Sequence, residues 1–81
     1  MRIYIVCKLN IDNTDNGLIL SVDPYITLET AINRAIVIIK QNVNNPDYVT
    51  RFTGEAKKYL NNGLSYEDHC GLVRILVKDA I

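Results

Sequence analysis

The sequence predicts a small α/β domain of the α+β type, in ββααβ order, with a three-stranded, mainly antiparallel sheet and two helices packed on one face. Three patterns lead to this prediction. The first nine residues form a strand that is apolar on both faces. Leu28 to Val43 has apolar residues at helical spacing, and Gly71 to Lys78 returns to the spacing of a strand. With 81 residues, we expect one domain over residues 1–81, near the lower size limit for a self-sufficient core.

The first strand, Arg2 to Leu9, is the most informative segment of the chain. One face carries Ile3, Ile5, Cys7 and Leu9, and the other carries Tyr4 and Val6 flanked by Arg2 and Lys8. A strand that is covered on one side only should alternate apolar with polar residues. Because this strand does not, we expect it to lie in the middle of the sheet and to meet something on its second face as well.

The second strand is predicted over Leu18 to Val22. It follows a polar loop, Asn10 to Gly17, that closes with an Asn-Gly turn signal, and so short a connection favours an antiparallel hairpin. The loop contains two aspartates among asparagines but lacks the spacing of a calcium site, so we expect a solvated hairpin loop. Asp23-Pro24 is predicted to end this strand.

Two helices are predicted next. Thr27 caps the first, whose apolar stripe consists of Leu28, Ala31, Ile32, Ala35, Ile36, Ile39 and Val43. Asn45 and Pro46 begin a second helix that ends near Asn61. Tyr48 to Thr53 also has strand-like content, and a break at Thr53-Gly54 is the alternative to one continuous helix. Leu64 to Cys70 is expected to be irregular, followed by the last strand.

The predicted faces of the sheet follow from alternation along the strands. We expect the helices to cover Ile3, Ile5, Cys7, Leu20, Val22, Val73, Ile75 and Val77. The uncovered face then presents Arg2, Tyr4, Val6, Lys8, Ile19, Leu72, Arg74, Leu76 and Lys78, which combine an apolar strip with four cations and no acid. This face is the predicted partner-binding site.

Three occupants fit such a face. A second copy of the chain would make a homodimer, and a larger protein or protein complex would use the aromatic and arginine side chains as anchors. Nucleic acid is the weaker expectation, because one exposed aromatic residue, Tyr4, makes a poor stacking platform. The nine basic residues are also balanced by nine acidic ones, so no overall field attracts a polyanion.

The sequence contains no motif for catalysis, and we expect no enzyme, no cofactor and no metal. Asp68-His69-Cys70 is the only group of residues that suggests catalysis or metal binding. Zinc needs about four ligands at set spacings, whereas the chain has one histidine and two cysteines without a paired spacing. Neighbouring His69 and Cys70 point apart in an extended segment, so they cannot form a nucleophile–base pair. Cys7 with His69 is the remaining combination, and it has no third group to orient the imidazole.

The absence of a long apolar run predicts no membrane segment, and two cysteines are too few for a disulfide scaffold, so a cytoplasmic location is expected. The eleven isoleucines and nine asparagines indicate an AT-rich coding genome. In size and layout the chain resembles the small single-domain proteins of phages and mobile elements, among them anti-CRISPR and other anti-defence inhibitors. No residue motif carries this resemblance.

The function predicted from the sequence is therefore a small non-enzymatic protein-binding module. It would act as an inhibitor or adaptor by steric occlusion of a larger protein, with an anti-defence role of anti-CRISPR type as the specific form. The alternative is a homodimeric nucleic-acid-binding or regulatory protein that uses the basic sheet face.

Overall fold

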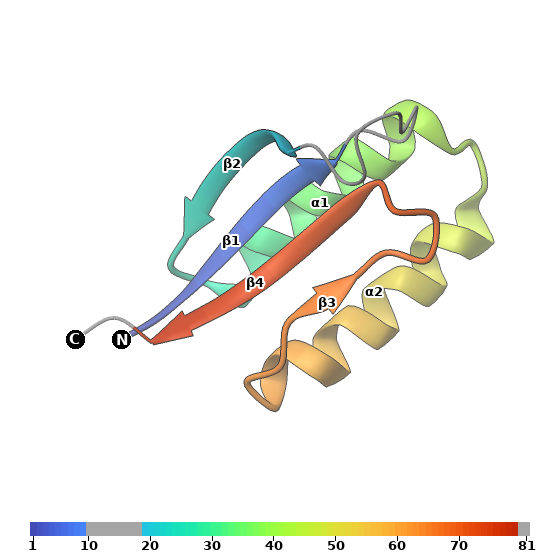
Figure 1. Cartoon of the computed structure of the whole chain (residues 1–81). Coiled ribbons are helices and arrows are strands. Elements are labelled where there is room, and N and C mark those ends of the chain that lie inside the picture. Colours follow the sequence, from blue (N-terminus) through green and yellow to red (C-terminus); the bar gives the residue numbers. More distant parts are fainter. Residues whose placement is uncertain (10–18, 80–81) are drawn as a thin grey trace.

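A computed structural model describes residues 1–9 and 19–79, and its elements form a sheet with both helices on one side (Figure 1). They are β1 (Arg2–Leu9), β2 (Ile19–Tyr25), α1 (Leu28–Asn42), α2 (Pro46–Asn61), β3 (Tyr66–Glu67) and β4 (Val73–Asp79). The strand order is β2-β1-β4-β3, and every neighbouring pair is antiparallel. The α+β class is confirmed, and β1 has neighbours on both sides as expected.

The predicted number of strands is wrong, because the sheet has four strands rather than three. The additional strand is β3, a two-residue segment within the stretch that was expected to be irregular. It pairs Tyr66 with Ile75 and Glu67 with Arg74 at the outer side of β4. Two residues show no hydrophobic period, so the sequence gives no signal for this strand.

Both helices begin where their caps predict. The Thr27 hydroxyl accepts a hydrogen bond from the Thr30 amide at 3.2 Å, and the Asn45 side chain accepts one from the Asp47 amide at 3.0 Å. Pro46 occupies the first turn of α2, where its missing N–H costs no hydrogen bond. α2 continues through Gly54 without a break, so the strand alternative for Tyr48 to Thr53 is wrong.

The strand β2 runs past its predicted end. Asp23 and Pro24 lie inside it, opposite Val6 and Ile5. Proline is tolerated here because β2 is an edge strand, whose outer side needs no N–H donor. The expected loop from Asn10 to Gly17, together with Leu18, lies outside the described residues.

The core lies between the helices and the face of β1 that carries Tyr4 and Val6. These two residues are 8% and 0% exposed, and they pack with buried residues of both helices, including Ile32, Ile39 and Phe52. The helix-facing set predicted for β1 is therefore wrong, since Ile3, Ile5 and Cys7 point to the other side. On β4 the prediction is correct, because Val73, Ile75 and Val77 belong to or pack against the core.

Arg2 joins the end of the sheet to the end of α2. Its guanidinium lies 3.5 Å from the carbonyl of Leu60 and 3.3 Å from the position that a Cβ would occupy on Gly63. Gly63 has φ +75°, a conformation that other residues adopt at a cost, so it ends α2 and leaves room for Arg2.

The outer side of β4 is only partly paired, because β3 covers Arg74 and Ile75 alone. Beyond β3, the hydroxyl of Ser65 accepts a hydrogen bond from the Val77 amide at 3.1 Å. A side chain thus takes the place of a neighbouring strand at this position.

Gly54→Ala should raise the free energy of unfolding by about 1 kcal/mol, because alanine is the better helix former. Nothing lies within 4 Å of an added Cβ there. Thermal unfolding followed by circular dichroism should show a Tm increase of about 4–8 °C. Gly63→Ala is the matched control and should lower the Tm. A Gly54→Ala variant that melts below the wild type would contradict a continuous α2.

Candidate functional site

The face of the sheet opposite the helices is the candidate site. We call it the open sheet face, and its residues are Ile3, Ile5, Cys7, Val22, Pro24, Glu67, Arg74, Leu76 and Lys78. Directly opposed residues of antiparallel strands share a face, so the register arranges them in rows. One row is Pro24, Ile5 and Leu76, and the next is Val22, Cys7, Arg74 and Glu67. In the described part of the chain both helices lie on the other side (Figure 1).

Apolar side chains occupy the middle of this face. Ile3, Ile5 and Leu76 are half-buried, and Val22 is 53% exposed. The predicted apolar strip therefore exists, but odd-numbered residues of β1 form it in place of Tyr4 and Val6.

The predicted binding residues fall into three groups. Arg74, Leu76 and Lys78 lie on the open sheet face, as alternation along the last strand predicts. Tyr4, Val6 and Leu72 are buried in the core instead, so their assignment to the uncovered face is wrong. Arg2 and Lys8 share the helix side of β1 with them, and the side chain of Ile19 lies outside the described residues. The role of the exposed positions in binding stays a prediction.

The charges on the sheet also differ from the prediction of four cations without an acid. Glu67 accepts a hydrogen bond from Arg74 Nε at 2.8 Å and forms an ion pair with the same guanidinium. Arg2 lies 3.8 Å from Asp79 at the strand end. Two of the predicted cations thus have carboxylate partners, which would compete with phosphate groups for them.

Cys7 lies on this face but is only 1% exposed. Val22 and Arg74 flank it in its row. Burial raises the pKa of the Cys7 thiol, and the nearby Arg74 guanidinium offsets part of this effect. A protonated, covered thiol is a weak nucleophile.

Asp68 belongs to the Asp68-His69-Cys70 segment that the sequence analysis considered for catalysis or metal binding. In the structure it organises the turn between β3 and β4. It is 2% exposed and accepts hydrogen bonds from the Tyr48 hydroxyl and from the Leu72 amide, the latter at 3.1 Å. Its carbonyl accepts the Gly71 amide at 2.9 Å, which closes a β-turn. The Tyr48 hydroxyl also accepts the Cys70 amide at 3.2 Å. This carboxylate therefore ties the turn to α2.

His69 makes its contacts on the helix side of the sheet. Its Nε2 lies 2.9 Å from Glu55 of α2, and the same carboxylate accepts a hydrogen bond from the Tyr66 hydroxyl. These two hydrogen bonds, that of Tyr66 first, lower the pKa of Glu55. Tyr66 packs between Phe52 and Tyr59, with ring centroids 5.7 Å and 5.0 Å away.

This arrangement does not bring Cys7 and His69 together, because they lie on opposite sides of the sheet. Within residues 1–9 and 19–79, no group of three or more histidine, cysteine or acidic side chains could hold a metal ion. Sequence reasoning missed the contacts of Tyr48 and Glu55 with the turn. The turn itself had a signal, an aspartate followed three residues later by a glycine, which is typical of a β-turn.

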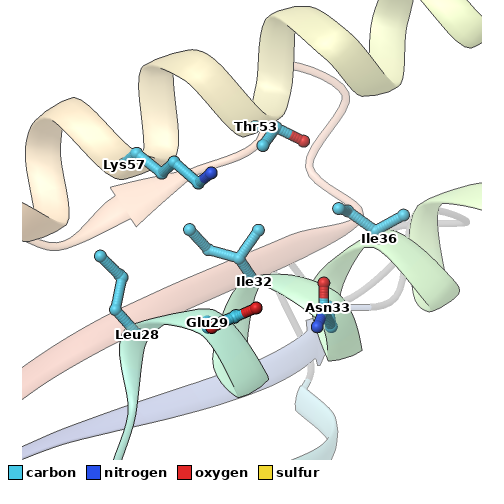
Figure 2. A pocket seen from close by; sticks show the side chains of 7 residues that line it. All are labelled: Leu28, Glu29, Ile32, Asn33, Ile36, Thr53 and Lys57. Carbon is cyan, nitrogen blue, oxygen red and sulfur yellow. The ribbon is translucent and has the colours of Figure 1, made fainter.

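A hollow of about 420 Å³ lies between the two helices (Figure 2). Leu28, Ile32 and Ile36 point into it from α1, and Thr53 and Lys57 border it from α2. The Thr53 hydroxyl is already bonded to the Val49 carbonyl at 2.8 Å. Glu29 and Asn33 of α1 complete the lining, so four polar and three apolar residues border this hollow.

Comparison with protein-family models, curated proteins and solved structures finds no match to this chain. No helix in the described ranges is long and apolar enough to cross a membrane.

Tyr48→Phe should lower the free energy of unfolding by about 1–3 kcal/mol, because it leaves buried Asp68 without its hydroxyl donor. Urea unfolding at neutral pH measures the change. Tyr59→Phe is the matched control, since the hydroxyl of this 43% exposed residue makes no hydrogen bond in the described part of the chain. Equal stability of the two variants would show that the Tyr48 contact contributes nothing.

Stability should fall at alkaline pH because the pKa of Tyr66 is raised. Burial of the hydroxyl is the main cause, and its hydrogen bond to Glu55 is the second. A tyrosine with a raised folded-state pKa contributes its full stabilisation below the unfolded value of about 10 and loses it as the pH rises further. The same holds for Tyr48, because its burial and its hydrogen bond to Asp68 raise the pKa of this hydroxyl. The free energy of unfolding, measured from about pH 8 to pH 11, should fall less steeply in Tyr66→Phe than in the wild type. Identical slopes would contradict this assignment.

Proposed function

We propose that this protein is a non-enzymatic binding module whose open sheet face docks on a larger protein and occludes it. The observation that carries the proposal is the apolar row of Pro24, Ile5 and Leu76 across three strands, on a side of the sheet where no described helix lies. Arg74 and Lys78 border the row, and arginine is among the side chains enriched in protein interfaces. The specific form of the proposal is an inhibitor of anti-defence type, as the size and layout of the chain suggest.

The accessible surface of the chain is that of a monomer. The chain exposes 5248 Å², close to the roughly 4,900 Å² that the relation between mass and surface gives for a monomer. The isolated fold thus has no excess surface that would require a permanent dimer.

The test uses the wild-type chain as bait, attached through its exposed thiol. Cys70 is exposed beside α2, whereas Cys7 is buried, so a maleimide at neutral pH couples to Cys70 and leaves the open sheet face outward. A lysate of the cells in which the encoding phage or mobile element is carried should yield a partner that Val22→Thr/Leu76→Thr no longer captures. These changes keep strand-forming side chains at exposed or half-buried positions, so the variant should melt near the wild type.

The matched control is Val37→Thr/Leu64→Thr, which alters two exposed apolar residues of α1 and the α2–β3 connection. It should retain the partner. Light scattering after size exclusion should give the monomer mass of 9.2 kDa for the wild type. A stable dimer that Val22→Thr/Leu76→Thr dissociates would instead assign the open sheet face to a second copy.

A further inference from the structure

The balanced composition of the chain hides an uneven distribution of its cations. Arg2, Arg34 and Arg74, which belong to the sheet or face it, have Asp79, Asp23 and Glu67 as ion-pair partners. Lys40, Arg51, Lys57 and Lys58 belong to the helices, and no described carboxylate lies within ion-pair distance of them. Lys8 of β1 and Lys78 of β4 also lie outside ion-pair distance of a described carboxylate, so four of the six lysines and arginines without such a partner belong to the helices.

Three of these four cations surround one residue, Gly54. Arg51 precedes it by three positions, and Lys57 and Lys58 follow it by three and four, which places all of them beside it on the helix surface. Gly54 is exposed, and nothing lies within 4 Å of an added Cβ. The helix backbone is therefore uncovered between the cations, which permits the close approach of a ligand.

We define the basic helix face as Thr50, Arg51, Gly54, Lys57, Lys58 and Asn61 of α2 with Lys40 of α1. All of these residues are exposed. Lys40 joins the others because it lines, with Thr50, a hollow of about 390 Å³ where the two helices connect. Lys57 stands at the rim, where it also borders the hollow between the helices (Figure 2). Arg51 and Lys58 are separated by about 10 Å along the helix axis.

Three acids lie near this face. Asp47 is in the first turn of α2, where its negative charge interacts favourably with the helix dipole. Glu29 belongs to α1 and lies across the hollow between the helices from Lys57. Glu55 is one turn from Arg51, but its carboxylate is engaged by Tyr66 and His69. The positive charge around Gly54 is thus not neutralised by a direct carboxylate contact.

We propose that the basic helix face binds the phosphate backbone of double-stranded nucleic acid. Lysine, arginine, threonine and asparagine are the side chains that contact phosphates, and they make up this face around Gly54. An acidic protein is the less suitable occupant, because protein interfaces rely on a central apolar or aromatic anchor and this face has none. The face is separate from the open sheet face, so this inference does not depend on the proposed function.

Fluorescence anisotropy with a labelled duplex of mixed sequence tests the proposal. Three to four phosphate contacts predict that log K falls with log[salt] with a slope of about −2.7 to −3.6 between about 50 and 200 mM salt. Arg51→Gln/Lys57→Gln/Lys58→Gln should weaken binding at least about ten-fold at low salt and reduce the slope toward about −1. Glutamine is a good helix former, and circular dichroism should show an unchanged fold.

The matched control is Lys8→Gln/Arg74→Gln/Lys78→Gln, which removes one arginine and two lysines from the sheet. It should retain most of the affinity. An equal loss in both triple variants would show an effect of net charge alone, and a wild type that does not bind at the lowest salt would overturn the proposal. Equal binding of poly-glutamate, lost in the same helix variant, would reassign the face to an acidic protein.

Gly54→Gln provides a second test that does not change the charge. Because glutamine is a better helix former than glycine and has free space there, this variant should melt at a higher temperature than the wild type. It should nevertheless bind the duplex several-fold more weakly, since its side chain covers the exposed backbone. Unchanged affinity would contradict the close approach at Gly54.

Discussion

The pairing of β1 with β4 determines the rest of this structure. Val6 and Ile75 lie opposite each other in the middle of that pair, and both are fully buried beneath the helices. Because side chains alternate strictly along a strand, this one register places every other residue of the two strands. It puts Tyr4 and Val77 under the helices and leaves Ile5 and Leu76 on the open sheet face. A shift by one residue would exchange the core and the exposed surface.

The sequence predicted the parts of the fold that depend on local interactions. Thr27 and Asn45 are side chains that accept hydrogen bonds from free helix amides, and they mark both helix starts correctly. The end of β2 was mispredicted because the tolerance for Pro24 depends on an edge position, which only the assembled sheet defines. β3 was missed for a similar reason, since its two residues become a strand only through their partners on β4.

The candidate site was predictable only where alternation is unambiguous. On β4 the polar residues Arg74 and Lys78 alternate with apolar ones, and that contrast indicates the outward side. β1 has apolar residues on both faces, so local pattern cannot choose between them, and packing against the helices decides. The charges were misjudged for a different reason. Formal counting treats Arg74 as a free cation, whereas β3 brings Glu67 next to it from seven residues away in the sequence.

The treatment of the sheet edges limits how copies of this protein can associate. Exposed strand edges are templates on which other chains add strands, a route to edge-to-edge aggregation. Here Pro24 removes one N–H donor from β2, and Ser65 occupies the Val77 amide beside the short β3. Both flanks are thus poor templates for further strands. Contacts with other molecules are thereby directed to the two broad surfaces of the molecule, where side chains rather than backbone groups decide which partner fits.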